Sequence, residues 1–335
     1  MFRQNIKVSS TRLPVLDLLR VIAMFFVMLM HSPVTGDPKD KPAVFFLKSF
    51  IASGAVPLFF LLSGYLGARK INDRGVSIGC YAKEKLHTLV IPFLFWNALV
   101  LSLVFLAKAI GLDSVSRSSG AYFDVEPTVS SIASALLGIG RPPIVYQFWF
   151  LRDLIVVTLV SFVICRYIPR IPLLPWLLFF IPIPMASSMG YFLLGYTIQP
   201  YFSTSQYFVG QSLGSYCIAW ILLGCGTIVM WTSIPFPLQQ IGSTTFILFL
   251  SLLLSRFALG QRLAVLGSST FLVYAIHEPM QTFIAKIWLA HGWPLYGSLF
   301  SFLLIPIVVL PLCILAYYFI RRLLPWLLPY VTGGR

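Results

Sequence analysis

The first apolar segment of the chain carries side chains that can bind an anion and move a proton. Segment 13–31 contains Asp17 and Arg20 and ends at His31. At ~1.5 Å per residue it is long enough to cross a bilayer as a helix. An ionisable group inside a membrane costs ~2.5–3.5 kcal/mol on insertion scales, so it usually faces a protein interior or a watery cavity. We therefore expect a functional site here, the alternative being a structural ion pair for Arg20 and an interfacial position for His31.

The composition is that of an integral membrane protein. The 335 residues are 58% hydrophobic and 10% charged, with a mean hydropathy of +0.88, whereas soluble domains have about 25% charged residues. The net charge of +14 is spread between apolar runs, so no nucleic-acid partner is expected. Five scattered cysteines do not form the spacing of a disulfide framework or a metal site. We expect a retained first span and a single membrane domain over 1–335, without an added soluble domain.

Hydropathy and helix-breaking residues predict an all-α bundle of about ten membrane helices. The predicted spans are 13–31, 44–68, 89–110, 143–165, 172–185, 187–201, 213–232, 238–257, 266–289 and 295–320. The fifth and sixth are weak because prolines interrupt them, and a short broken pair of helices is the alternative. The inner segments hold fifteen lysines and arginines, whereas the outer loops hold Lys39, Lys41, Arg117 and Arg141. The positive-inside rule then places both termini in the cytoplasm.

This topology gives a depth to each polar residue. Arg20, Arg152 and the pair His277 and Glu278 are predicted near the middle of the membrane. His31 lies eleven residues beyond Arg20, which is ~16 Å closer to the outer surface. The alternative for the mid-membrane layer is an interhelical network of ion pairs that fixes helix packing.

The end of the second span gives a separate signal. It finishes in Ser63, Gly64 and Tyr65, and Arg69 and Lys70 follow directly. Further basic residues of the same inner segment are Arg74, Lys83 and Lys85. The small residues suit close helix packing. The basic group is either a plain topology signal or a binding site for a phosphate-rich ligand.

Four motifs, in this order, resemble the acyltransferase family 3 membrane O-acyltransferases of bacteria. They are Arg20 followed by ten residues and His31, the FFLLSGY that ends at Tyr65, the WFL of 149–151 and the YAIHEP of 274–279. The resemblance runs from about residue 13 to 320. It implies a multi-pass protein of the bacterial inner membrane.

The resemblance implies transfer of an acyl group, usually acetyl, from cytoplasmic acyl-CoA to a hydroxyl of a cell-surface glycan or lipid-linked sugar. The donor would be acetyl-CoA or another acyl-CoA, and no metal is expected. In the family the histidine matching His31 is catalytic, and the arginine matching Arg20 is required and taken to bind the donor. Where relatives often carry arginines, in 81–92, this chain has Lys83 and Lys85, which cannot copy bidentate phosphate contacts.

The chemistry of the side chains agrees with this reaction. A sugar hydroxyl is a poor nucleophile, and an imidazole is the usual base that activates it. We predict His31 as that base and Glu278 as the carboxylate that orients it. The developing oxyanion needs a hydrogen-bond donor, and Arg152, Ser63 and Tyr65 are the candidates. The predicted donor-binding residues are Arg20, Ser63, Tyr65, Arg69, Lys70 and Arg152.

A secondary transporter or exporter of a polar or lipid-linked solute is the main alternative. Ten spans, a proline-rich region and charges within the membrane would suit it. The chain has no internal repeat, which counts against it. A purely structural membrane subunit would leave the polar residues Arg20, His31, Arg152 and Glu278 without a role.

Overall fold

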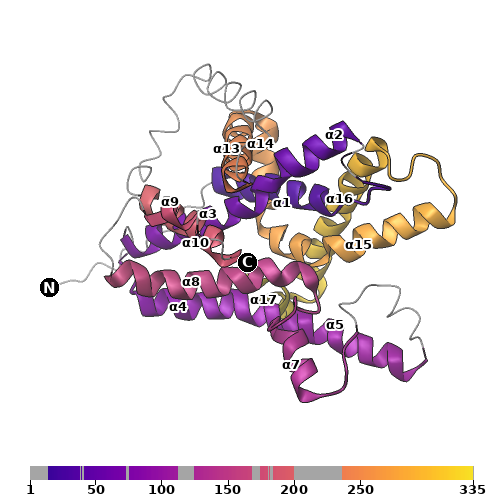
Figure 1. The fold of residues 1–335 in the computed structure, drawn as a ribbon, viewed down its shortest axis with the longest axis horizontal. Coiled ribbons are helices and arrows are strands. Elements are labelled where there is room, and N and C mark those ends of the chain that lie inside the picture. Colours follow the sequence, from indigo (N-terminus) through magenta and orange to yellow (C-terminus); the bar gives the residue numbers. More distant parts are fainter. Residues whose placement is uncertain are drawn as a thin grey trace.

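The computed structural model describes residues 14–37, 39, 41–72, 75–111, 124–167, 174–179, 181, 184–199 and 236–334. Every regular element in these residues is a helix (Figure 1), which confirms the predicted all-α class. The helices before residue 140 are α1 (Pro14–His31), α2 (Pro42–Phe45), α3 (Ala55–Asn72), α4 (Ile78–Lys85), α5 (Ile91–Ala109) and α7 (Val129–Leu137). Those after it are α8 (Trp149–Tyr167), α9 (Leu174–Leu178), α10 (Pro184–Ile198), α13 (Phe236–Ser255), α14 (Ala258–Ala264), α15 (Thr270–Ala290), α16 (Leu299–Leu323) and α17 (Leu328–Thr332).

Short non-α turns join several of these helices. The π-helical turns are Phe46–Ile51, between α2 and α3, and Leu86–Val90, between α4 and α5. The 3₁₀ turns are Ala52–Gly54, Tyr146–Phe148, Val265–Ser269 and Pro325–Leu327. Such turns change the direction or phase of a helix and often occur beside functional sites.

Five helical stretches in the described residues are long and apolar enough to cross a membrane. They are Pro14–His31, Pro42–Asn72, Ile78–Ala109, Ala258–Ala290 and Leu299–Leu323. They contain the predicted spans 13–31, 44–68, 89–110, 266–289 and 295–320, apart from small differences at the ends. The protein is therefore an integral membrane protein.

The other predicted spans are not among these five stretches. Helix α8, of 19 residues, overlaps predicted span 143–165, and α13, of 20 residues, overlaps predicted span 238–257. The weak fifth and sixth spans correspond to α9 and α10, of 5 and 15 residues. Predicted span 213–232 lies outside the described residues. The described residues therefore support five spans by length and apolarity, and the predicted count of about ten is not confirmed.

The third stretch begins earlier than predicted because helix continues through a polar segment. Ser77 caps the start of α4 by accepting a hydrogen bond from the Cys80 amide at 3.2 Å, a common N-terminal cap. The π-helical turn Leu86–Val90 then leads into α5 without a break. A hydropathy profile detects only the apolar part of this helix, so the predicted span begins at residue 89. The basic residues of α4 therefore extend the span rather than forming a loop.

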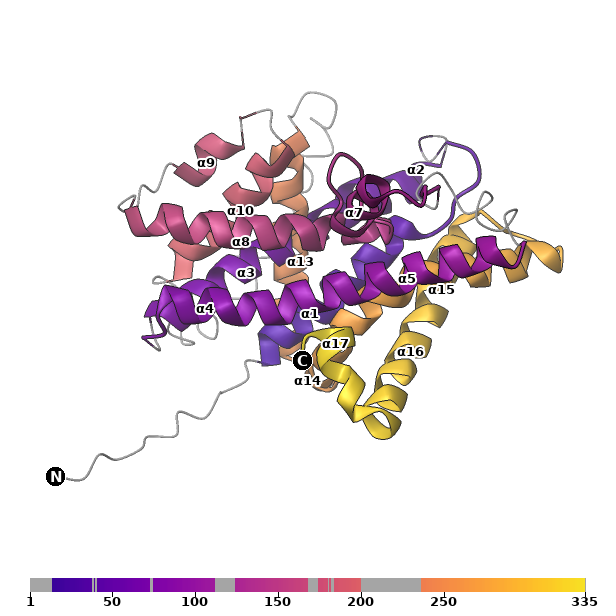
Figure 2. The same ribbon diagram turned by 90° about the horizontal axis from the view of Figure 1, so that it is seen from below.

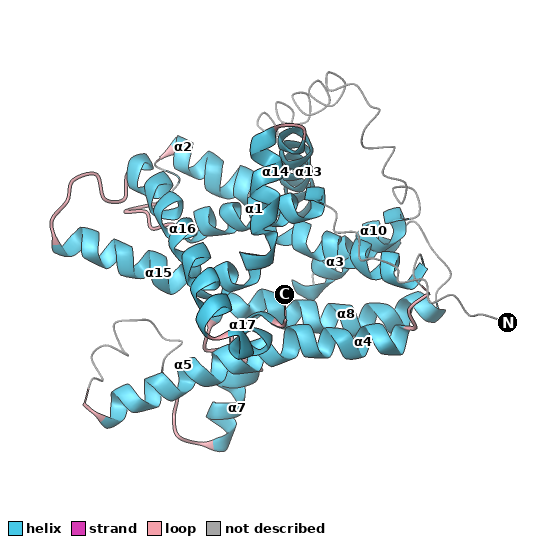
Figure 3. Cartoon of the chain, turned by 180° about the vertical axis from the view of Figure 1, so that it is seen from behind, coloured by secondary structure: helices cyan, strands magenta, loops and turns pink. Residues whose placement is uncertain are grey.

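Helix α1 lies at the centre of the main core. Its residues Leu18, Leu19, Met24 and Met28 are each at most 1% exposed, and α3, α13, α14, α15 and α16 all contact the helix. Figure 3 shows the same packing from behind, with α4 running alongside α8. The polar residues of α1 are therefore held by a helix that is fixed on most sides.

Two glycines let α3 and α10 touch backbone to backbone. Figure 2 shows both helices grouped with α8 in one part of the molecule. A Cβ atom added at Gly64 would lie 1.9 Å from the carbonyl oxygen of Phe192. A Cβ atom added at Gly195 would lie 2.0 Å from the carbonyl oxygen of Leu61. Small residues commonly allow this approach between membrane helices. The packing-face interpretation of Gly64 is thus confirmed.

We predict that Gly64→Ala destabilises the protein because its methyl group collides with backbone that cannot move independently. Overpacking of this kind typically costs about 1–3 kcal/mol. The measurement is thermal unfolding of the purified protein in detergent. Gly79→Ala is the control, because Gly79 lies in α4 with nothing within 4 Å of its added Cβ. Equal melting temperatures for the two variants would contradict the close contact.

Candidate active site

An elongated cavity of about 580 Å³ lies between α1, α3, α4, α8 and α15. His31 lines one end of it, and Arg69, Lys70 and Lys85 line the other. Along α3 its wall runs from Val56 to Lys70, an interval of ~21 Å along a helix axis. The cavity therefore connects two chemically different ends, which we call the His31 end and the basic end.

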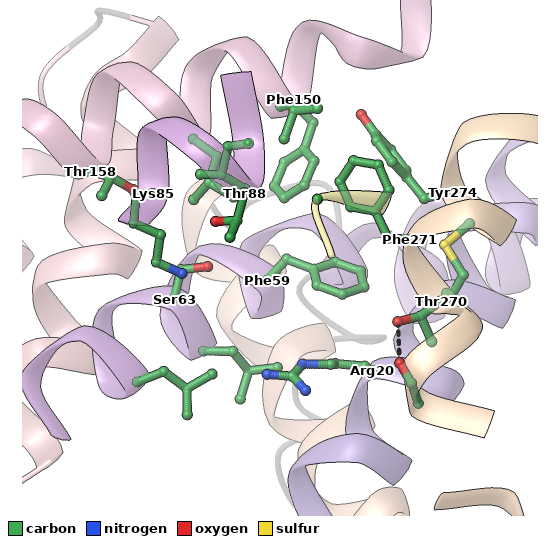
Figure 4. Close-up of a pocket in the computed structure, with 18 of the residues that line it drawn as sticks. Arg20, Phe59, Ser63, Lys85, Thr88, Phe150, Thr158, Thr270, Phe271 and Tyr274 are labelled. Atoms are coloured by element: carbon green, nitrogen blue, oxygen red, sulfur yellow. Dashed lines mark hydrogen bonds between the residues drawn. The ribbon is translucent and has the colours of Figure 1, made fainter. Parts of the chain in front are cut away.

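The middle of the cavity has an apolar wall. Figure 4 shows Phe59, Phe150 and Phe271 around it, contributed by α3, α8 and α15. Phe59 and Phe150 also contact each other, with ring centroids 5.8 Å apart. A ligand that fills the cavity would thus place an uncharged section between its two ends.

The basic end has a positive balance. Its charged lining consists of the cations Arg20, Arg69, Lys70 and Lys85 and the carboxylates Asp17 and Glu84. Arg20 Nη1 lies 2.6 Å from Asp17 Oδ1, and the Arg20 side chain remains 31% exposed. Lys70 pairs with Glu84. Four cations against two carboxylates leave two positive charges, which favours an anionic ligand.

A glycine places the Asp17 and Arg20 pair at the wall. A Cβ atom added at Gly267 would lie 2.6 Å from Asp17 Cβ. The turn Val265–Ser269 therefore packs directly on the start of α1. Asp17 and Arg20 are three residues apart, a spacing at which helical side chains meet. The alternative of an interhelical ion pair does not hold for Arg20, since its carboxylate partner is on its own helix.

The His31 end is polar and aromatic. His31 Nδ1 lies 2.7 Å from the Tyr146 hydroxyl, and its ring centroid lies 5.3 Å from that of His277. The Tyr274 hydroxyl donates to the carbonyl of Gln147 at 2.6 Å. This last bond ties the turn before α8 to α15. Three separate segments of the chain therefore meet around one imidazole.

His277 is fully buried, and its tautomer follows from its bonds. Its Nδ1 lies 2.8 Å from the Tyr274 carbonyl and 3.2 Å from the Val273 carbonyl. Since a carbonyl oxygen only accepts, the proton is on Nδ1. Within the described residues, Nε2 is buried with no hydrogen-bond partner. An imidazole whose Nε2 has no partner among the described residues thus packs beside His31.

His277 lies at the level of His31 and not, as the sequence predicted, at the level of Arg20. Because the turn Val265–Ser269 packs on Asp17, α15 begins close to the level of Arg20. His277 is ten residues beyond Gly267, or ~15 Å along a helix. That distance brings His277 to His31 rather than to the level of Arg20.

Five of the predicted site residues line the cavity. They are His31, Arg20, Ser63, Arg69 and Lys70. Glu278, Tyr65 and Arg152 do not belong to its lining. No group of three or more His, Cys, Asp or Glu in the described part of the chain could hold a metal ion.

Packing explains why Tyr65 and Arg152 lie elsewhere. Tyr65 is on the side of α3 that meets α10, where a Cβ added at Gly195 would lie 3.0 Å from its amide nitrogen. Arg152 Nε lies 2.9 Å from Asp153 Oδ1, and Nη1 donates to the Gly138 carbonyl at 2.7 Å. The guanidinium of Arg152 is thus held by its own helix and by the turn after α7.

Within the described residues, no hydrogen bond joins Glu278 to His31. The Glu278 carboxylate accepts a hydrogen bond from Thr282 at 3.2 Å, one turn further along α15. The hydrogen-bond partner of the His31 ring is instead Tyr146, which the sequence analysis did not identify. Its one sequence signal is its place three residues before the WFL motif.

Comparison with known proteins defines the class. A family described as an acyltransferase domain matches residues 13–318, which is nearly the whole chain. The protein therefore belongs to this acyltransferase family. It is 25% identical over 352 residues to the succinoglycan biosynthesis protein ExoH of Rhizobium meliloti (strain 1021), covering 96% of this chain and 92% of the relative. No solved structure matches the chain.

We predict that a thiol at position 63 is reachable from water. In a background with the native cysteines replaced by alanine, Ser63→Cys should react with a small methanethiosulfonate at least about tenfold faster than a fully buried thiol. Ser301→Cys is the matched control, because Ser301 is a fully buried helical serine that does not line the cavity. Similar rates at both positions would contradict a cavity along α3.

Proposed function

We propose that the protein transfers an acyl group, acetyl in the first instance, from cytoplasmic acyl-CoA to a sugar hydroxyl at the bacterial inner membrane. The observation that carries this proposal is the cavity that joins the His31 imidazole to a cluster of cations. Family membership supports acyl transfer. The succinoglycan biosynthesis relative favours a polysaccharide or its lipid-linked precursor as acceptor.

The donor would lie along the cavity. Its phosphates would meet Arg69 and Lys70 at the basic end, where cations favour them. The uncharged pantetheine arm would pass the phenylalanines of the middle section. Arg20 and His31 are eleven residues apart on one helix, and ~16 Å suits an extended arm that ends at the imidazole. The basic end would face the cytoplasm, as the positive-inside rule requires.

His31 would act as the general base. Its Nε2 would take the proton of the acceptor hydroxyl while that oxygen attacks the thioester carbonyl. The carbon–sulfur bond then breaks, and the proton passes to the departing thiolate of coenzyme A. The acyl group ends on the sugar oxygen. Of the three candidate oxyanion donors, Ser63 lines the cavity, whereas Tyr65 and Arg152 do not.

Tyr146 would orient the base in place of Glu278. For Nε2 to accept a proton, Nδ1 of His31 must carry its own proton and donate it to the Tyr146 hydroxyl. His277 packs edge-on against the same ring and limits the space around it. Both are positioning residues in this proposal, because they act through His31.

We predict that His31→Ala removes acyl transfer while the protein stays folded. A general base contributes about 10²–10⁴-fold to the rate. The measurement is acyl-CoA consumption by purified protein offered a panel of sugars and lipid-linked glycans. His291→Ala, at an exposed histidine outside the cavity, should retain wild-type activity. Solute flux by a wild type that neither binds nor consumes acyl-CoA would favour a transporter.

Arg20→Ala should weaken donor binding rather than remove the base. Loss of a charged contact to the donor is worth about 1.5–3 kcal/mol, which corresponds to roughly a 10- to 100-fold higher KM for acyl-CoA. Arg321→Ala, at an exposed arginine of α16, is the control. An unchanged KM in Arg20→Ala would remove Arg20 from the donor site.

Tyr146→Phe should lower kcat by about 10- to 100-fold because the imidazole loses the partner that fixes its tautomer. The KM for acyl-CoA should not change, and this separates positioning of the base from general damage to the cavity. Tyr318→Phe, on α16 and partly exposed, controls for the loss of a tyrosine hydroxyl. A kcat equal to that of the wild type would show that Tyr146 does not orient His31.

A further inference from the structure

The segment that follows α16 folds back against the helices and reaches the basic end of the cavity. The turn Pro325–Leu327 leads into α17, and Trp96 Nε1 donates to the Val331 carbonyl at 3.1 Å. Val331 packs with Leu272 and Tyr317 and is only 2% exposed. Thr332 is fully buried. These contacts with α5, α15 and α16 fix the segment in place.

Gly333 brings the backbone of this segment onto Thr88. Gly333 has φ +70°, and a Cβ added to it would lie 2.2 Å from the Thr88 carbonyl oxygen. Both the backbone conformation and the contact therefore require glycine. Gly333 and Thr88 each line the cavity. The two chain segments thus form one continuous part of its wall.

The Thr88 hydroxyl makes no hydrogen bond within the described residues, although its Oγ1 is buried. Thr88 lies in the π-helical turn Leu86–Val90, a type of turn that is frequent at functional sites. Figure 4 shows it at the cavity beside Lys85. A buried hydroxyl without a partner is unfavourable unless a ligand supplies one.

The surroundings of Thr88 favour an anionic ligand. Lys85 lies one helical turn before it, and Lys85 Nζ is 5.2 Å from the centre of the Tyr81 ring. Arg69 and Lys70 line the same end of the cavity. A hydroxyl can donate to a phosphate oxygen. The phenylalanine wall offers no such groups, so the phosphates and not the acyl arm match this position.

We propose that segment 328–333 and the Thr88 hydroxyl form a subsite for the phosphate-bearing part of the acyl donor. The proposal rests on the proposed function, because it assumes a coenzyme A thioester as donor. The Thr88 hydroxyl donates to a phosphate oxygen, and Lys85 supplies positive charge nearby. Gly333 keeps the folded-back segment close enough to Thr88 to close this side of the cavity.

The test compares ligands with and without phosphates. Calorimetry on the purified full chain measures the affinity for coenzyme A and for pantetheine. Thr88→Val and Gly333→Ala should each bind coenzyme A about tenfold more weakly, with an unchanged affinity for pantetheine. Gly140→Ala is the matched control, since Gly140 has φ +73° and nothing within 4 Å of its added Cβ. The Gly140→Ala variant has the same backbone strain as Gly333→Ala but no collision, so it should bind coenzyme A and pantetheine as tightly as the wild type does.

The outcomes separate this inference from the proposed function. If the wild type binds coenzyme A and Thr88→Val binds it equally well, the subsite is wrong and the acyltransferase proposal stands. If the variants lose affinity for coenzyme A and for pantetheine alike, the segment supports the cavity generally, and this result also overturns a phosphate subsite. If the wild type binds neither ligand, both proposals fail. Should Gly333→Ala not fold, Thr88→Val decides the matter alone, because it keeps the shape of the side chain.

Discussion

The cost of placing ionisable groups in a low-dielectric bilayer is the constraint on which the rest of the structure depends. Helix α1 carries Asp17, Arg20 and His31 within an apolar run, and each needs a partner inside the protein. Asp17 and Arg20 pair with each other, whereas His31 bonds to Tyr146 from a distant part of the chain. The remaining helices are arranged so that a cavity, and not lipid, meets these groups.

Close backbone contacts are what give that cavity its shape. Gly64 and Gly195 bring α10 onto α3, Gly267 brings the turn before α15 onto α1, and Gly333 brings the last segment onto Thr88. At each of these positions a methyl group would collide with backbone or with a side-chain Cβ atom. The walls of the cavity are therefore positioned by backbone geometry, which is stiffer than side-chain packing, and long flexible side chains such as Arg20 only line the space that remains.

Features that depend on one helix could be predicted from the sequence. Arg20 and His31 are eleven residues apart, close to three full turns, so they share one face of a helix whatever surrounds it. The all-α class and five apolar stretches follow from hydropathy for the same reason. The contacts of Tyr146, the level of His277 and the course of 328–333 could not be predicted, because each depends on packing between segments far apart in the sequence.

The misplaced level of His277 shows how such an error arises and why it matters for the chemistry. Hydropathy marked the ninth span from residue 266, but it could not tell that Val265–Ser269 would be a turn resting on Asp17. With α15 starting at that level, His277 reaches the end of α1, and its carbonyl-bonded ring packs on His31. Glu278, the next residue, then points toward Thr282. The neighbours of the His31 ring are therefore a second imidazole and a tyrosine hydroxyl rather than the predicted carboxylate, and the proposed reaction requires the uncharged form of His31, which can accept a proton from a sugar hydroxyl.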